Sequence, residues 1–239
     1  MKIFLSRFLE SGVFRVNSNI IFTSSPIVVN RSDFLRFENI RIQNFTITGS
    51  GAGILSATAG GNIQLENVTV DNISVLNGNK SGAAFNGTTS FRAENCTFSN
   101  NSCTGSTGFS AGLYVMSSGD ITIDNCKFIN NSTTSTTWQG YASAFLSTDY
   151  NDVMGDTYIN NCLFTGNTNN GGNSTIFAKS LLGGSVSFTN NTVVDNQAAY
   201  GIEFKGNIDF RNNILRNNSY YEIYLNIIDP GIASTLNVS

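Results

Sequence analysis

The amino-acid sequence predicts an all-β fold, a right-handed single-stranded parallel β-helix of about seven to eight coils, each built from three short strands. Three observations predict it. One asparagine recurs at the same place in seven aligned segments, apolar and polar residues alternate on both sides of it, and similar apolar residues recur at matching positions of successive segments. The asparagines lie 22 to 36 residues apart, which is a period typical of a solenoid. The predicted asparagine ladder consists of Asn44, Asn67, Asn95, Asn125, Asn161, Asn190 and Asn212.

Each segment is expected to hold two strands joined by a tight bend at its asparagine. In one segment, Ile63 and Leu65 alternate with polar residues before Asn67, and Val68 and Val70 do so after it. This is the period of two of a half-buried strand, with its phase shifted by one residue at the asparagine. The shift requires a bend, and asparagine tolerates the left-handed backbone conformation that such a bend needs. The stacked amides are expected to hydrogen bond between coils.

A third strand completes each coil, marked by small residues followed by a large apolar one, as in residues 51–54 and 82–85. Three inward columns result, in which like residues stack on like. The first column is Phe45, Val68, Cys96, Cys126, Cys162, Asn191 and Asn213. The second is Ile47, Val70, Phe98, Phe128, Phe164, Val193 and Leu215, and the third-strand column is Ile54, Phe85, Leu113, Phe145, Ile176, Ile202 and Ile223. An up-and-down sandwich, the alternative, does not explain the recurring asparagine.

The chain is expected to form a single β-helix domain over residues 17–239, preceded by an N-terminal segment, residues 1–16. That segment begins like a signal peptide, but Arg7 and Glu10 interrupt its apolar run. The alternative is a short amphipathic helix that caps the first coil. Its apolar face would consist of Phe4, Leu5, Phe8 and Leu9. We expect no membrane span, because no stretch approaches the roughly 20 apolar residues that one needs.

The composition favours an extracellular or cell-surface location. Only 12% of the residues are charged, well below the roughly 25% of typical soluble domains, and asparagine, serine, threonine and glycine take their place. The net charge is −3 and no basic patch is evident, so a nucleic acid is not an expected partner.

Several segments resemble the repeats of the chlamydial polymorphic outer-membrane proteins. Residues 98–101, 128–131 and 164–167 match the F-x-x-N half of that repeat, and residues 51–54 and 111–113 approximate its G-G-A-I half. More broadly, residues 34–226 are similar to bacterial β-helix surface proteins of the pectin-lyase-like superfamily. The resemblance implies the fold but not one function, because this superfamily contains adhesins, lyases, hydrolases, epimerases and phage tailspikes. The G-G-A-I half is degenerate in most coils.

The four cysteines are expected to be buried thiols, since Cys96, Cys126 and Cys162 fall in one inward column. The alternatives are a disulfide between neighbouring coils or between Cys96 and Cys103. The chain has no histidine, which excludes Ser-His-Asp and Cys-His catalysis, and the cysteine spacing does not suit zinc.

Calcium is the one cofactor for which the sequence offers ligands. Asp149, Asp152 and Asp156 cluster in a loop, and carboxylate oxygens on a flexible loop suit Ca²⁺. A solvated acidic turn is the alternative, and otherwise no cofactor is expected. With Lys179 or Lys205 as the base, the same cluster would support a Ca²⁺-dependent polysaccharide lyase. That lyase is the enzymatic alternative, ahead of a glycoside hydrolase.

An apolar and aromatic stripe is predicted along the outer face of the third strand. The residues that follow the inward ones must point outward, and exposed apolar patches usually mark interaction sites. We therefore predict an adhesin-like surface module that binds glycan or protein there, although the long loops at 102–110, 131–141 and 148–156 could instead cover the stripe. A structural filament subunit that stacks end to end with another subunit is a further alternative. The predicted binding residues are Leu55, Tyr114, Leu146, Phe177 and Tyr224.

Overall fold

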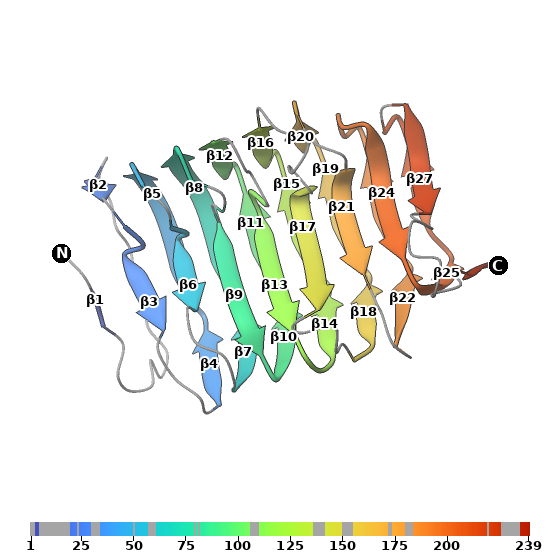
Figure 1. The fold of residues 1–239 in the computed structure, drawn as a ribbon, viewed down its shortest axis with the longest axis horizontal. Coiled ribbons are helices and arrows are strands. Elements are labelled where there is room, and N and C mark those ends of the chain that lie inside the picture. Colours follow the sequence, from blue (N-terminus) through green and yellow to red (C-terminus); the bar gives the residue numbers. More distant parts are fainter. Residues whose placement is uncertain are drawn as a thin grey trace.

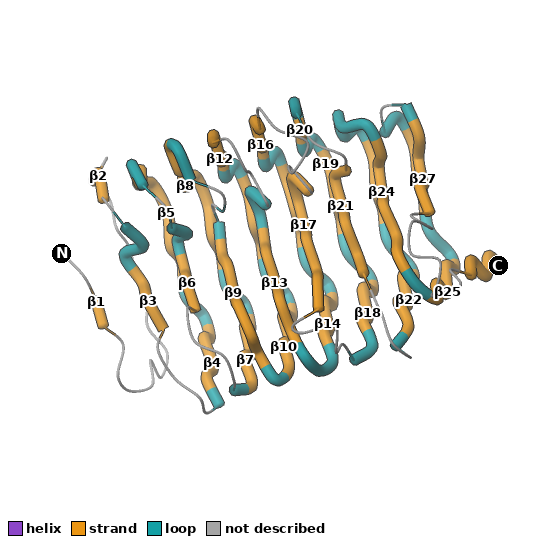
Figure 2. The backbone as a smooth tube through the Cα atoms, in the orientation of Figure 1, coloured by secondary structure: helices purple, strands orange, loops and turns teal. Residues whose placement is uncertain are grey.

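The structure is a computed structural model of the 239-residue chain. It describes residues 3–4, 20–22, 24–29, 34–49, 51–56, 61–78, 80, 82–105, 110–135, 142–149, 155–171, 174–179, 184–218, 220–225 and 235–239. Every regular element in these ranges is a β-strand (Figure 2). The strands stack in parallel into three sheets.

The sheets contain nine, eight and eleven strands among the described residues. The first contains β1 (Ile3–Phe4), β3 (Ile27–Val29), β6 (Ile54–Ser56), β9 (Ala83–Thr88), β13 (Leu113–Ser117), β17 (Ala142–Asp149), β21 (Ser174–Lys179), β24 (Tyr200–Lys205) and β27 (Tyr221–Leu225). The second contains β4 (Leu35–Glu38), β7 (Asn62–Glu66), β10 (Ser90–Glu94), β14 (Ile121–Asp124), β18 (Thr157–Asn160), β22 (Ser185–Thr189), β25 (Asn207–Arg211) and β28 (Thr235–Val238). The third contains β2 (Ile20–Phe22), β5 (Arg41–Ile47), β8 (Thr69–Leu76), β11 (Thr97–Ser99), β12 (Ser102–Gly105), β15 (Lys127–Ile129), β16 (Ser132–Ser135), β19 (Leu163–Thr165), β20 (Thr168–Asn169), β23 (Thr192–Val194) and β26 (Ile214–Arg216).

The chain visits the three sheets in a fixed order, so that successive coils stack along one axis. The strands β3, β4 and β5 form one coil, β6, β7 and β8 form the next, and the pattern continues to β24, β25 and β26. Figure 1 shows the strands of each sheet side by side and the two termini at opposite ends of the solenoid. This arrangement confirms the predicted parallel β-helix. Within residues 1–16 the structure describes only β1, which includes Phe4. The other residues of the helix predicted as an alternative for that segment lie outside the described residues.

The bends between the second and third sheets confirm the conformation predicted for six of the seven ladder asparagines. Their φ angles lie between +50° and +58°, in the left-handed region. Neighbouring side chains bond along the row: Asn125 donates to Asn95 at 2.5 Å, and Asn161 donates to Asn125 at 3.4 Å. The row lies on the surface, where its members are exposed. The six residues are Asn67, Asn95, Asn125, Asn161, Asn190 and Asn212.

The placement of Asn44 at the start of this row was wrong. The first position belongs to Asn39, whose φ is 55° and whose Oδ1 accepts a hydrogen bond from Asn67 Nδ2 at 3.0 Å. Asn44 opens a second row of left-handed residues at the following bend, where Asn72 donates to it at 2.9 Å.

The packing of β4 explains this correction. The segments that begin at residues 35 and 40 show the same apolar alternation, so the pattern alone does not choose between them. In the structure, Leu35 pairs with Ile63 and Phe37 with Leu65, and Phe37 is only 2% exposed. A phenylalanine buries more apolar surface than any residue that the other alignment offers to this column.

The second inward column is confirmed from Val70 onward. The ring of Phe128 stacks between Phe98, at 5.2 Å between centroids, and Phe164, at 4.7 Å. The first aligned segment begins at residue 35 instead of residue 40. The residue that stacks next to Val70 in this column is therefore Ile42, and not Ile47.

The third-strand column needs one correction, at Phe85. Its register position belongs to Ala83, which pairs with both Ile54 and Leu113. The preceding glycines fix this register: a Cβ at Gly82 would lie 2.3 Å from the carbonyl oxygen of Gly112. The glycines must therefore align, and Phe85 moves two residues along the strand to pair with Val115.

Candidate functional site

The predicted outer stripe is largely covered. Tyr114, Leu146 and Phe177 do occupy one outward column, as the register of β13, β17 and β21 requires. They are only 4%, 2% and 6% exposed, however, and form a second apolar cluster outside the main core. The expectation of an open binding surface at these three residues was therefore wrong. Lys80 contributes to their cover, because its Nζ lies 4.4 Å from the centroid of the Tyr114 ring, and burial lowers the pKa of this lysine.

The two ends of the stripe differ from its middle. Leu55 pairs with Ala84 in the register, but its side chain lies outside the described residues. Tyr224 remains partly exposed and stacks on Tyr200 with 4.2 Å between ring centroids. Between them, the carboxylate of Glu203 is buried next to Phe177 in the same column.

The predicted calcium cluster can be judged only at Asp156. Its Oδ1 accepts hydrogen bonds from the backbone N–H of Ser185, at 2.8 Å, and from the Ser185 hydroxyl, at 2.9 Å. Its Oδ2 accepts one from the Tyr158 hydroxyl at 3.0 Å. Burial raises the pKa of Asp156, but the hydrogen bonds from Ser185 and Tyr158 outweigh it, and the pKa lies below the ordinary value. Asp156 thus fastens one coil to the next.

The other two acids of that cluster are not placed. Asp152 and the side chain of Asp149 lie outside the described residues. Within the described ranges, no group of three His, Cys, Asp or Glu side chains is arranged to hold a metal ion.

The cysteines are free and buried, as predicted, and three of them replace asparagine in an inward column. The backbone N–H of Cys96 points at Cys126 Sγ, and that of Cys126 points at Cys162 Sγ, each at 3.4 Å. The next acceptor in the column is Asn191 Oδ1, 2.8 Å from the Cys162 nitrogen. Hydrogen bonding with Cys126 and burial raise the pKa of Cys96, and burial raises that of Cys103 to about 12. Thiols with such pKa values are not nucleophiles at neutral pH.

The structure contains a second, buried asparagine ladder that the sequence analysis did not predict. Each Nδ2 donates to the Oδ1 of the next asparagine, from Asn101 to Asn131 at 3.0 Å and from Asn131 to Asn167 at 3.0 Å. The same nitrogen also donates to a backbone carbonyl, so these polar side chains are satisfied inside the solenoid. The signal for this ladder was the F-x-x-N motif, whose last residue is the buried asparagine. The ladder consists of Asn101, Asn131, Asn167, Asn196 and Asn218.

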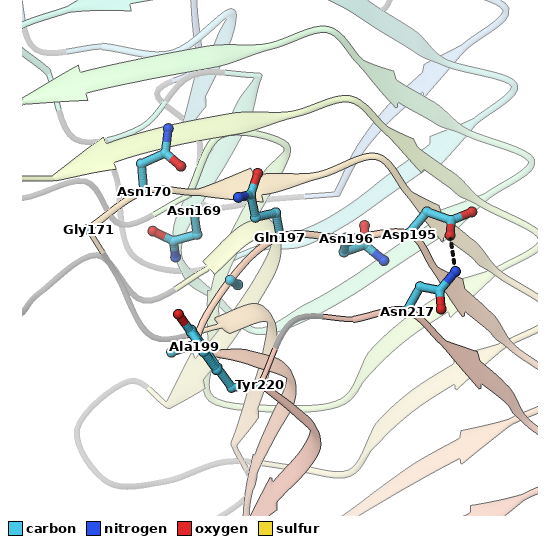
Figure 3. A pocket seen from close by; sticks show the side chains of 10 residues that line it. Asn169, Asn170, Gly171, Asp195, Asn196, Gln197, Ala199, Asn217 and Tyr220 are labelled. Atoms are coloured by element: carbon cyan, nitrogen blue, oxygen red, sulfur yellow. Dashed lines mark hydrogen bonds between the residues drawn. The ribbon is translucent and has the colours of Figure 1, made fainter.

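A recess lies where β20, the β23–β24 connection and the segment before β27 meet. We call it the tyrosine–amide groove (Figure 3). Its volume is about 790 Å³, and three successive coils contribute to it. Its walls are formed by Asn169, Asn170, Gly171, Asp195, Asn196, Gln197, Ala198, Ala199, Asn217 and Tyr220.

The groove combines exposed amides with an exposed aromatic ring. Tyr220 is 87% exposed, while Asn170 and Gln197 are exposed on the two preceding coils. In the described part of the chain, the side-chain amides of Asn170 and Gln197 make no hydrogen bond. Asp195 is held in place, since its Oδ1 accepts a hydrogen bond from Asn217 Nδ2 at 3.0 Å (Figure 3).

Sequence reasoning did not find this groove. Its tyrosine lies two residues after Asn218 and belongs to no repeat position, and its amides are a few among many in an asparagine-rich chain. Only the stacking of the coils brings them together.

Comparison with known proteins identifies the family. A family model described as a right-handed β-helix region matches residues 10–179. No curated protein and no solved structure matches the chain significantly. In the described residues there is no helix long and apolar enough to cross a membrane. The match covers most of the chain and agrees with the three parallel sheets, so the chain belongs to the right-handed β-helix family.

Proposed function

We propose that this chain is an extracellular or surface-exposed, adhesin-like binding module that takes a glycan in the tyrosine–amide groove. The observation that carries the proposal is that three successive coils place Tyr220, Asn170 and Gln197 in the lining of one groove. The side-chain amides of Asn170 and Gln197 make no hydrogen bond within the described residues. An amide offers both donors and an acceptor, which matches the hydroxyl groups of a sugar. A tyrosine ring offers a flat apolar face with a polar edge, which suits a ring that is apolar on its faces and polar at its rim.

The fold supports such a role by making the groove rigid. Asn196 lines the groove and is also a member of the buried ladder, where its Nδ2 donates to Asn218 Oδ1 at 2.7 Å. The N–H of Gln197 donates to the carbonyl of Asn167 at 2.8 Å, which fixes the backbone beneath its exposed amide. A ligand would therefore meet side chains carried on a fixed backbone, which lowers the entropic cost of binding. The composition agrees with a surface location, since only 12% of the residues are charged.

A glycan array probed with the purified chain tests the proposal. We expect a restricted set of glycans to bind, and to do so without being cleaved. A parallel assay for unsaturated products, with and without added Ca²⁺, examines the lyase alternative. Binding to no glycan would contradict the proposal, and Ca²⁺-dependent release of unsaturated oligosaccharides would replace it with the lyase.

A further inference from the structure

The charge of the tyrosine–amide groove restricts its ligand. The ten lining residues include one ionisable carboxylate, that of Asp195, and no lysine, arginine or histidine. The carboxylate is exposed and accepts a hydrogen bond from Asn217. The groove therefore presents a negative charge with no positive charge among its lining residues.

The arginines whose ion pairs are described lie elsewhere. Arg36 and Arg92 bond to glutamates on the second sheet, and Arg211 bonds to Asp209 there. The cation nearest in sequence is Arg216, next to Asn217. It is exposed at the end of β26 and is not part of the groove lining.

From this charge distribution we infer that the groove selects neutral, hydroxyl-rich saccharides and discriminates against uronic-acid chains. The inference rests on the proposed glycan-binding function and names its ligand class. A uronate carboxylate in the groove would share it with the Asp195 carboxylate, with no cation among the lining residues, and like charges at close range repel each other. A neutral sugar incurs no such cost, and its hydroxyl groups can donate to the Asp195 carboxylate. A charge-assisted hydrogen bond of this kind is stronger than a neutral one.

Replacing Asp195 with asparagine tests the effect of the charge, because asparagine adopts the same backbone conformation at this position. Its φ is 58°, and asparagines occupy the equivalent positions at Asn130 and Asn217, with φ of 54° and 56°. Asp195→Asn removes the charge and keeps an oxygen that can accept the bond from Asn217. The variant should therefore fold like the parent protein, and a change in ligand preference would report the charge alone.

The experiment measures the affinity of the parent chain, Asp195→Asn and Asp209→Asn for two sets of probes. The neutral probes are oligosaccharides derived from xylan, mannan and glucan, and the acidic probe is oligogalacturonate of matched length. Asp209→Asn is the matched control, since it removes a carboxylate on β25, outside the groove lining. We expect the parent to bind a neutral probe at least about tenfold more tightly than oligogalacturonate, which is the change that a free-energy difference of about 1.4 kcal/mol produces. Of the two variants, we expect only Asp195→Asn to reduce the ratio between the affinity for the neutral probe and the affinity for oligogalacturonate.

The outcomes separate the two proposals. If oligogalacturonate binds the parent as well as or better than the neutral probes, the inference about charge is wrong while the glycan-binding function stands. An unchanged ratio in Asp195→Asn, or the same change in Asp209→Asn, also overturns the inference. If neither class of saccharide binds and a protein ligand is found instead, the proposed function itself is wrong.

Discussion

The side-chain nitrogen of Asn218 donates to the carboxylate of Glu222 at 2.6 Å, and this contact ends the buried asparagine ladder. Every earlier ladder residue donates to the next asparagine along the solenoid, whereas Asn218 meets an acid from the start of β27. Glu222 also accepts the backbone N–H of Asn218 at 3.3 Å. It thus makes the two bonds that another asparagine would make.

Replacing Glu222 with leucine should therefore destabilise the last coils. The change leaves the backbone N–H of the buried Asn218 without this acceptor, and a buried unpaired group costs about 1–3 kcal/mol. Glu222→Gln keeps an acceptor oxygen and should remain close to the parent in stability. Chemical denaturation of both variants measures the difference, and equal stability of the two would show that the contact does not close the ladder.

The two asparagine rows should differ in what they contribute to stability. Asn131→Leu removes a residue that both donates to Asn167 and accepts from Asn101, so buried groups on two neighbouring coils lose a partner, each at about 1–3 kcal/mol. Asn125→Leu acts at the surface, where the main cost is the left-handed conformation, about 1–2 kcal/mol.

Asn125→Gly provides the control, because glycine adopts a positive φ without strain. We expect it to retain most of the stability that Asn125→Leu loses. If Asn131→Leu proves no more damaging than Asn125→Leu in denaturant titrations, the buried row is not the main polar element of the solenoid.

The aromatic stack at Phe128 is the most demanding test of the core register. The ring is fully buried between Phe98 and Phe164, so Phe128→Ala should cost about 3–5 kcal/mol through lost burial and the cavity left behind. A loss below about 1 kcal/mol, measured by the same unfolding experiment, would mean that these rings do not stack in the folded protein.

The sequence alone predicted the class of fold, the left-handed bends and the stacking of Phe128, because each of these depends on a period of two or on the conformational freedom of asparagine. It misplaced Asn44 because two overlapping segments carry the same alternation. It misplaced Phe85 because the register there depends on a close approach of Gly82 to the backbone of the next coil. These errors arise from contacts between coils, which a local pattern does not contain.

The candidate binding surface was harder to predict for the same reason. The outward direction of Tyr114, Leu146 and Phe177 followed correctly from the alternation, but their cover depends on other parts of the chain. The groove around Tyr220 joins residues from three coils and has no sequence signature of its own.

Acid should weaken the contact between coils that Asp156 makes. The pKa of Asp156 in the folded protein lies below the ordinary value of 3.8, so its contribution to stability is present above that value and is lost as the pH falls through the lower, folded value. Thermal unfolding measured between about pH 5 and pH 3 should show a smaller loss for Asp156→Asn than for the parent. Parallel pH profiles for the two proteins would contradict this role, and Tyr158→Phe, which removes one of the stabilising bonds, should fall between them.

The most direct test of the proposed function is a calorimetric titration of the parent chain, Tyr220→Ala and Tyr158→Ala with the glycan that binds best on the array. Tyr220 and Tyr158 are both exposed tyrosines, but only Tyr220 lines the groove. We predict that Tyr220→Ala weakens binding at least about tenfold, as loss of an aromatic anchor does, and that Tyr158→Ala leaves the affinity unchanged. Equal affinities for the parent and Tyr220→Ala would contradict the claim that the tyrosine–amide groove is the binding site.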